Sequence, residues 1–383
     1  MKILRSIHSV NPAVGGPIEG VRQSSAVLAR LGHVVELISL DAPGDPWVRD
    51  CSVPVHAMGN GRGGYGYSPR FTEWIRERHA DYDAVIVHGI WQYSSLGVWR
   101  ALRGTSTPYF VFPHGMLDPW FNRTYPLKHL KKLLYWPLEY RVLRDAAAVL
   151  FTSESERRLA RESFYFYRCN EVVVNYGTAA PTVDLSAARE EFFDRFPELR
   201  GKRLLLFLGR LHEKKACGLL LQAFALSGGA TLHLVMAGPC ADDDYLAELK
   251  RLAAADRNAS HVTFTGMLTG TAKWGAFAAA EAFILPSHQE NFGIAVAESL
   301  AVGVPVLISN QVNIWREIES DRAGYVEPDD LGGITRLIER WLTTEETERA
   351  AMRVNAKRCF ENRFEVNRAA ESLIKIIEAN AAR

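Results

Sequence analysis

Cysteine is scarce in this sequence, and its spacing excludes two common kinds of structural site. The five cysteines, at positions 51, 169, 217, 240 and 359, are scattered and form no Cys-x-x-Cys pair. A disulfide framework or a structural zinc site needs closer and repeated spacings, so neither is expected. Single, scattered cysteines are typical of a reducing compartment, and we expect the protein to be cytoplasmic.

Long apolar runs and a strong net charge are also missing. No apolar run approaches the roughly 18 residues of a membrane-spanning helix, and Arg5 interrupts the apolar start, which argues against a signal peptide. The net charge is +1, with +5 on residues 1–180 and −4 on the remainder. Nucleic-acid binding usually shows a much denser basic stripe, so it is not expected. The basic first half leaves room for an anionic acceptor or a membrane surface.

The composition that is present is that of a soluble globular protein. Hydrophobic residues make up 48% and charged residues 23% of 383 residues, a length that suggests two or three domains. Short apolar runs alternate with helical patterns, such as a helix at 21–31, and this predicts α/β domains with parallel sheets. The predicted strands are 3–7, 34–40, 84–88, 109–112, 147–152, 203–208, 232–237, 282–285 and 305–308.

The alternation is interrupted at residues 178–202, where we place the domain boundary. This predicts an N-terminal domain at 1–180 and a C-terminal domain at 181–365, each with a doubly wound sheet. Such sheets bind ligands outside the carboxyl ends of their strands, so motifs directly after a strand are the candidates for a site.

Residues 288–317 form the most informative stretch. A polar loop with Glu290 runs into Gly293, and a helix predicted at 294–302 follows, whose only ionisable residue is Glu298. A carboxylate in a buried helix is costly unless it is paired or hydrogen-bonded, and the first N–H groups of a helix form an anion site. A ligand with a negative part and neighbouring hydroxyls, such as a nucleotide-sugar, would satisfy both features.

The spacing from Glu290 to Glu298, with Phe-Gly between and Gly-x-Pro-Val after, resembles the signature of family-4 retaining glycosyltransferases of the GT-B fold. The resemblance implies two doubly wound, Rossmann-like domains facing across a cleft, with a last helix at 366–383 that crosses back to the first domain. Two further segments resemble the same family: Gly209-Arg210-Leu211 with Lys214-Lys215, and Asn11-Pro12-x-x-Gly15-Gly16-Pro17.

By this resemblance Glu298 accepts hydrogen bonds from the donor ribose, and Glu290 contacts hydroxyls of the transferred sugar. The backbone N–H groups just after Asn291 would meet the donor phosphates. Without the resemblance, Glu298 reads as a buried carboxylate that fixes a neighbouring loop, and Glu290 as a favourable charge at a helix start. The loop residues assigned to the donor site are Asn291, Phe292, Gly293 and Ile294.

Arg210 and Lys215 follow the strand predicted at 203–208. A leaving nucleoside diphosphate gains negative charge as the glycosidic bond breaks, so fixed cations there would stabilise the transition state. The family pattern usually reads Lys-Gly at this point, whereas this chain has Ala216 after the lysine pair. The local turn is therefore in doubt, and it stays open whether Lys214 or Lys215 reaches the phosphates; we favour Lys215. The alternative for the lysine pair is a solvated face.

In the first half, His114 follows the strand predicted at 109–112 and by resemblance contacts the donor sugar near the reacting centre. His88 ends the preceding strand and is a second candidate. Either residue could instead be a histidine whose hydrogen bonds are satisfied at a strand end, and for His88 we favour that interpretation. Gly15 and Gly16 by resemblance close over the donor phosphates and the acceptor. No carboxylate stands out as a covalent nucleophile, in agreement with the front-face displacement commonly assigned to the family.

The acidic run at 242–244 has the composition of a metal-binding motif. It opens a helix predicted at 245–253, where acids are favourable as caps and next to the helix dipole. We therefore expect no metal, and no cofactor besides the nucleotide-sugar co-substrate.

Residues 123–136 mix basic, aromatic and aliphatic side chains at helical spacing. One interpretation is peripheral contact with the inner face of a membrane or with a polyprenyl-linked acceptor. The other is an ordinary amphipathic helix whose lysine stems cover the core. The sequence does not decide between them.

The leading hypothesis is a retaining glycosyltransferase of the hexosyltransferase type. It would move a sugar from a UDP- or GDP-sugar to a glycan or lipid-linked oligosaccharide acceptor in polysaccharide biosynthesis. A nucleotide-sugar epimerase or hydrolase of the same fold is one alternative, and a non-catalytic sugar-binding relative is another. A dehydrogenase is excluded because the chain lacks the glycine fingerprint of a dinucleotide site.

Overall fold

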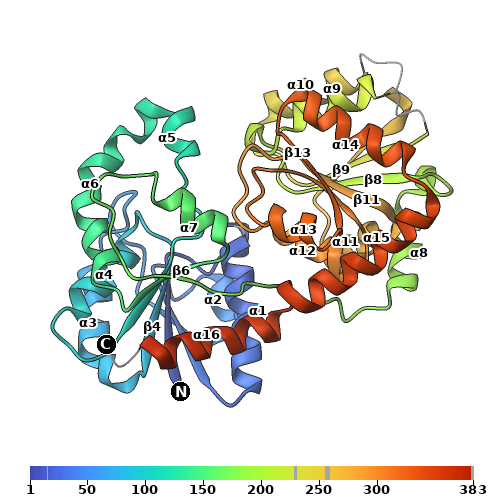
Figure 1. Ribbon diagram of the computed structural model, residues 1–383. Coiled ribbons are helices and arrows are strands. Elements are labelled where there is room, and N and C mark those ends of the chain that lie inside the picture. Colours follow the sequence, from blue (N-terminus) through green and yellow to red (C-terminus); the bar gives the residue numbers. More distant parts are fainter. Residues whose placement is uncertain (15, 228–230, 255–258, 381–383) are drawn as a thin grey trace. The chain divides into compact units, whose positions relative to one another are not determined.

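The computed structural model describes residues 1–14, 16–227, 231–254 and 259–380 of the chain (Figure 1). It divides into two compact units. Unit 1 comprises Met1–Thr178 and Glu365–Arg383, and unit 2 comprises Ala179–Phe364.

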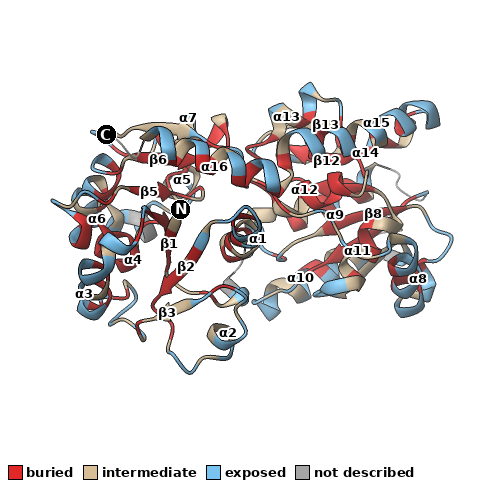
Figure 2. Cartoon of the chain, turned by 90° about the horizontal axis from the view of Figure 1, so that it is seen from below, coloured by how far each residue is buried: buried red, intermediate tan, exposed pale blue. Residues whose placement is uncertain are grey.

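Unit 1 is built on a parallel sheet, whose described strands lie in the order β3-β2-β1-β4-β5-β6-β7. Central strands such as β4 are wholly buried, as expected of a parallel sheet covered on both faces. Figure 2 shows this burial in red. The strands are β1 (Lys2–Ile7), β2 (Val34–Ser39), β3 (Val55–Ala57), β4 (Ala84–His88), β5 (Tyr109–Phe112), β6 (Ala148–Phe151) and β7 (Glu171–Val173).

The helices of unit 1 connect these strands, and the last one returns from the far end of the sequence. α16 (Val366–Asn380), red in Figure 1, packs against α1 (Gly16–Arg30). The other helices are α2 (Pro46–Arg49), α3 (Pro69–Arg78), α4 (Tyr93–Leu102), α5 (Trp120–Thr124), α6 (Pro126–Arg144) and α7 (Glu154–Ala160).

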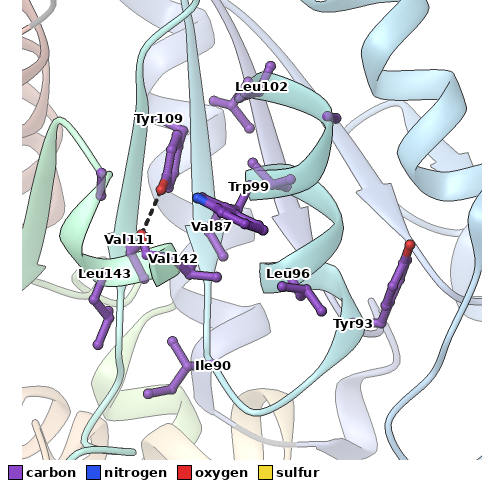
Figure 3. Close-up of a cluster of buried hydrophobic side chains, with 14 of the residues drawn as sticks. Val87, Ile90, Tyr93, Leu96, Trp99, Leu102, Tyr109, Val111, Val142 and Leu143 are labelled. Atoms are coloured by element: carbon purple, nitrogen blue, oxygen red, sulfur yellow. Dashed lines mark hydrogen bonds between the residues drawn. The ribbon is translucent and has the colours of Figure 1, made fainter. Parts of the chain in front are cut away.

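A hydrophobic cluster between the sheet, α4 and α6 forms a core of unit 1. Figure 3 shows Trp99 of α4 beside Val87 of β4 and Val142 of α6. The hydroxyl of Tyr109 donates a hydrogen bond to the Val142 carbonyl at 2.7 Å, so the polar end of this buried ring is satisfied.

Unit 2 has a second parallel sheet, with its described strands in the order β10-β9-β8-β11-β12-β13. The strands are β8 (Leu204–Leu208), β9 (His233–Ala237), β10 (Val262–Gly266), β11 (Ala280–Leu285), β12 (Val306–Ser309) and β13 (Gly324–Glu327). The helices are α8 (Leu185–Arg195), α9 (Cys217–Leu226), α10 (Asp243–Ala254), α11 (Gly270–Ala279), α12 (Ile294–Ala301), α13 (Trp315–Ser320), α14 (Leu331–Thr343) and α15 (Glu346–Cys359), which continues into a π-helical turn, Phe360–Phe364.

Every strand predicted from the sequence is a strand in the structure, with ends shifted by at most two residues. The helix predicted at 21–31 begins earlier, at Gly16, because Pro17 is compatible with the first turn of a helix. Four strands were not predicted: β3, β7, β10 and β13. None of the helices in the described ranges is both long and apolar enough to cross a membrane.

Candidate active site

The carboxyl end of the unit 2 sheet brings together loops that are far apart in the sequence. The loop after β11 contacts the loop after β8, since the His288 N–H donates to the Lys214 carbonyl at 2.9 Å. It contacts the loop after β12 through Glu290, whose backbone N–H donates to Gln311 at 3.1 Å and whose carbonyl accepts from Asn313 at 2.9 Å. These bonds fix Glu290 next to the end of β8.

Lys215 and Glu290 form an ion pair at this edge. Their side chains are 13% and 20% exposed, so the pair is largely shielded from water. Burial acts to raise the pKa of Glu290, but the charges of Lys215 and Lys214 outweigh it, and the pKa lies below its ordinary value. Glu290 is therefore an ionised acceptor for hydroxyl groups at neutral pH.

Gly293 shapes the turn between Glu290 and α12. It has φ of +75°, and a Cβ there would lie 3.1 Å from Val296 Cγ2 and 3.3 Å from Glu290 Cγ. A side chain would therefore be strained and crowded at this position. Phe292, which is buried, packs edge-on against Phe364 and anchors the loop. The first N–H groups of α12, beginning at Ile294, lie beyond this turn at the helix N-terminus.

Glu298 lies on α12 and is only 4% exposed. Its Oε1 lies 2.7 Å from Lys273 Nζ on α11, which is the cation that compensates this buried carboxylate. The sequence predicted that Glu298 needs a partner but did not identify Lys273. The two residues are far apart in the chain, and nothing in the local spacing marks this lysine.

The turn after β8 settles the doubt about Ala216. This residue adopts the left-handed conformation (φ +55°) that glycine favours, between the 3-10 turn Glu213–Lys215 and α9. The turn is therefore formed in spite of the alanine. Lys215, one of the two candidate lysines, pairs with Glu290. Arg210, the other cation predicted at this site, is exposed directly after β8. Which lysine meets a phosphate stays a prediction.

In unit 1, His88 and His114 are brought together. A hydrogen bond of 3.0 Å joins His88 Nδ1 and His114 Nε2, and the rings stack. Burial, and then the charge of Arg5, lower the pKa of His114 to about 4. Burial also lowers the pKa of His88 well below its ordinary value, so both histidines are neutral at pH 7. His114 has a positive φ of +50°, which is uncommon for a residue other than glycine.

A buried carboxylate that the sequence did not single out holds the loop around His114. Glu156 of α7 accepts hydrogen bonds from the Gly115 N–H at 2.6 Å and from the N–H and hydroxyl of Thr152, both at 2.7 Å. It thereby ties the end of β5 to the end of β6. A Ser-x-x-Glu capping pattern at Ser153 is the sequence signal that could have pointed to it.

The glycine pair at 15–16 and the acidic run at 242–244 were also predicted features. Gly16 is the first residue of α1, whereas Gly15 lies outside the described residues. Asp242 caps α10, since its Oδ1 accepts from the Tyr245 N–H at 3.0 Å, and Asp243 and Asp244 stand in the first turn. Helix capping accounts for this acidic run.

Comparisons with known proteins identify the family of the chain. Residues 15–177 match the family model of the glycosyl transferase 4-like domain, and residues 188–358 match that of glycosyl transferases group 1. Among characterised relatives, alpha-monoglucosyldiacylglycerol synthase of Streptococcus pneumoniae is 27% identical over 341 residues, which cover 84% of this chain and 74% of that protein.

Solved structures show the same fold over the whole chain. Sucrose-phosphate synthase of Thermosynechococcus elongatus superposes with a TM-score of 0.80 at 19% sequence identity. The match covers 100% of this chain and 99% of the synthase chain. HepE of Anabaena, solved in complex with UDP and glucose, has a TM-score of 0.78 at 17% identity, with 99% and 100% covered. The chain therefore belongs to the family-4 glycosyltransferases and has the GT-B fold.

Proposed function

We propose that this glycosyltransferase moves a sugar from a nucleotide-diphosphate sugar, with a UDP- or GDP-sugar as donor, to a glycan or lipid-linked oligosaccharide in polysaccharide biosynthesis. The observation that carries the proposal is the pair of charged contacts in unit 2, Lys215 with Glu290 and Lys273 with Glu298. Two carboxylates supply acceptors for hydroxyls, and a helix N-terminus supplies donors for phosphates, as a nucleotide-sugar requires.

The roles follow from the chemistry of the leaving group. Glu298 accepts hydrogen bonds from the ribose, and Glu290 from the transferred sugar. As the glycosidic bond breaks, negative charge grows on the diphosphate, and Lys215 and Arg210 stabilise it. The backbone N–H groups at Gly293 and Ile294 bind the same oxygens.

In unit 1, neutral His114 is proposed to contact the transferred sugar. Gly16, the first residue of α1, is proposed to close over the donor phosphates and the acceptor. Retention of configuration is part of the proposal. So is transfer without a metal, since the cationic side chains supply the charge that a metal would otherwise provide.

UDP is the first nucleotide to test, because HepE, of the same fold, was solved with UDP and glucose. We expect one of UDP, GDP, ADP, CMP and dTDP to raise the melting temperature of the wild type. Glu298→Ala should abolish the shift. A ligand at a hundred times its dissociation constant adds about 2.7 kcal/mol, which a thermal scan detects.

Turnover of the matching nucleotide-sugar then separates the alternatives. Release of nucleoside diphosphate that depends on an added glycan or lipid-linked acceptor, with the anomeric configuration kept in the product, supports the proposal. Release of free sugar at the same rate with or without acceptor would favour a hydrolase, and isomerised nucleotide-sugar an epimerase. Absence of nucleotide binding would favour a non-catalytic relative.

The exposed face of α6 supports a peripheral contact between unit 1 and a membrane that contains the acceptor. Leu127, Leu130 and Leu134 are 87%, 59% and 81% exposed, and they lie on one face because their spacings are three and four residues. Tyr165 and Phe166, 86% and 90% exposed, lie in the segment after α7, and the indole N–H of Trp136 donates a 3.0 Å hydrogen bond to the Tyr165 carbonyl.

The charge on this helix suits an anionic lipid surface. Residues 119–138 contain no acidic residue and carry the lysines and the arginine of the stretch at 123–136. Sedimentation with vesicles of anionic lipid tests the contact. We expect Leu134→Asp and Lys131→Glu each to weaken binding, whereas Leu226→Asp, at an exposed leucine of unit 2, serves as control. Equal sedimentation of all variants would contradict the membrane contact.

A further inference from the structure

α11 holds a cation against the carboxylate that the proposed function assigns to the donor ribose. Lys273 Nζ lies 2.7 Å from Glu298 Oε1, and the two side chains are 24% and 5% exposed. The carboxylate end of the pair is therefore enclosed, whereas the lysine reaches the surface of unit 2. This asymmetry distinguishes it from the solvent-exposed pairs elsewhere in the unit, such as Arg353 with Glu346.

Stability alone does not explain such a pair. The cost of removing two charges from water offsets most of their attraction, so apolar residues of similar size would serve the fold as well. A carboxylate that must accept hydrogen bonds from two hydroxyl groups has a different requirement. Only its ionised form is purely an acceptor, and a buried carboxylate without a cation takes up a proton more readily.

The packing of α11 holds Lys273 in a fixed position. Gly275 allows α8 to approach closely, since a Cβ there would lie 2.1 Å from the Ala188 carbonyl oxygen. Phe277 is buried in the core of unit 2 on the same helix. The ammonium group also lies 4.7 Å from the ring centre of Trp274, a cation–π contact that limits its freedom.

We propose that Lys273 is a positioning residue for ribose recognition. It keeps Glu298 ionised and fixes the orientation of the carboxylate, so that the donor hydroxyls find a preformed acceptor. Lys273 thereby sets the preference of the enzyme for a ribonucleotide over a deoxynucleotide. The inference rests on the proposed function, because it needs Glu298 to bind the ribose.

The test compares UDP with 2′,3′-dideoxy-UDP, or the corresponding GDP pair if the wild type selects guanine, by isothermal titration of the full chain. The wild type should bind the ribonucleotide about tenfold to a hundredfold more tightly, the effect of hydrogen bonds to a charged group. Lys273→Met should bring the ratio of the two affinities close to one, and Lys273→Arg should restore most of it.

Two controls separate positioning from folding. Lys273→Met by itself removes the cation beside a buried carboxylate, so Lys273→Met combined with Glu298→Gln should recover thermal stability without recovering the preference for ribose. Lys250→Met, at an exposed lysine of α10, should leave both affinities as in the wild type.

The outcomes distinguish this inference from the proposed function. If Glu298→Gln removes the preference for ribose and Lys273→Met keeps it, the role of Lys273 is wrong and the donor site stands. If the wild type binds none of the nucleotides, the proposed function fails and the inference fails with it.

Discussion

The contact between Lys215 and Glu290 makes the stability of the protein depend on acidic pH. The pKa of Glu290 is below its ordinary value of 4.5, so the folded state favours the ionised form more than the unfolded state does. The resulting stabilisation is complete above pH 4.5 and is lost as the pH falls through the lowered pKa of the folded state.

We predict that Glu290→Gln flattens the decline of the unfolding free energy below pH 4.5. Urea unfolding at a series of pH values between neutral and acidic checks it. Glu361→Gln, at an exposed residue of unit 2, is a suitable comparison. An unchanged slope in Glu290→Gln would contradict the ion pair.

His114 gives a second pH dependence in a higher range. Its pKa is about 4 in the folded protein, against an ordinary value of 6.5. The unfolded chain therefore binds a proton between these values and the folded protein does not, so stability falls as the pH is lowered from 6.5 to about 4.

His114→Asn should remove a contribution on the order of 3 kcal/mol from the difference in unfolding free energy between pH 7 and pH 4. Chemical unfolding at the two pH values measures it, and the chemical shift of the imidazole gives the pKa directly. A normal histidine pKa at this position would refute the burial argument.

Individual residues also show which features of the site a short stretch of sequence can predict. Glu290 and Glu298 stand out in the sequence because a charge in an apolar helix and a carboxylate before a glycine are unusual. Their partners do not stand out in this way. Lys215 was favoured over Lys214 for contact with a phosphate but was not predicted to pair with Glu290, and Lys273 was not predicted at all. An ion pair is defined by the packing of two elements rather than by either sequence.

At the scale of elements, the four unpredicted strands share one property. β3 and β7 are the edges of the first sheet, and β10 and β13 are the edges of the second. Their residues are mostly half-exposed, whereas the central strands are buried. An edge strand contacts one neighbour only, so its sequence need not be continuously apolar and gives a weak signal.

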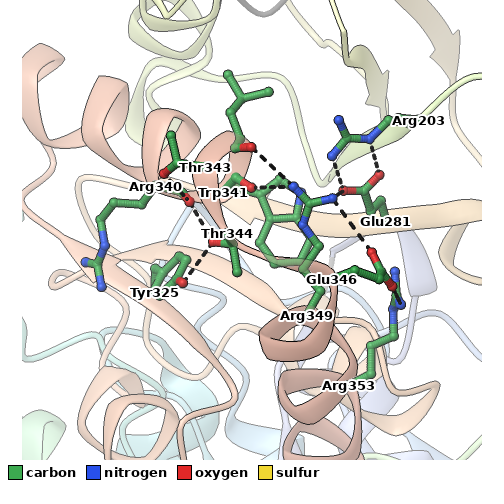
Figure 4. A network of polar contacts seen from close by, with 11 residues as sticks. Arg203, Glu281, Tyr325, Arg340, Trp341, Thr343, Thr344, Glu346, Arg349 and Arg353 are labelled. Atoms are coloured by element: carbon green, nitrogen blue, oxygen red, sulfur yellow. Dashed lines mark hydrogen bonds and ion pairs between the residues drawn. The ribbon is translucent and has the colours of Figure 1, made fainter.

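A polar network joins three elements of unit 2 at the amino end of its sheet, opposite the candidate site (Figure 4). Glu281 of β11 accepts two hydrogen bonds of 2.7 Å from Arg203, and its Oε1 lies 3.2 Å from Arg349 of α15. Arg349 also donates to the Trp341 carbonyl at 2.9 Å, at the end of α14.

Arg349→Met should lower the unfolding free energy by about 2–4 kcal/mol, because it removes one of the two cations that compensate Glu281 and the side-chain donor to the Trp341 carbonyl. Arg353→Met is the matched control. Arg353 stands one turn later on the same helix, is 41% exposed and pairs with an exposed Glu346, so its loss should cost less than about 1 kcal/mol. Equal destabilisation in urea unfolding would show that the network contributes no more than a surface pair.

At the scale of the whole molecule, the matches of the two halves to two glycosyltransferase models and the shared GT-B fold establish the class of enzyme. The charge that assists the leaving group is proposed to come from side chains. We therefore predict that EDTA leaves the transfer rate unchanged and that added Mn²⁺ does not raise it. Loss of activity in EDTA that Mn²⁺ restores would overturn the metal-independent proposal.

The sequence by itself determined the fold class, the nine buried strands and the motif around Glu290 and Glu298. These are local properties, because alternating apolar runs and a charge in an apolar helix are visible within a few tens of residues. Tertiary structure decided the edge strands, the hydrogen-bonded histidine pair, and the choice of Lys273 and Glu156 as partners. Those features depend on which elements pack together, and short windows of sequence hold no information on contacts between residues far apart in the chain.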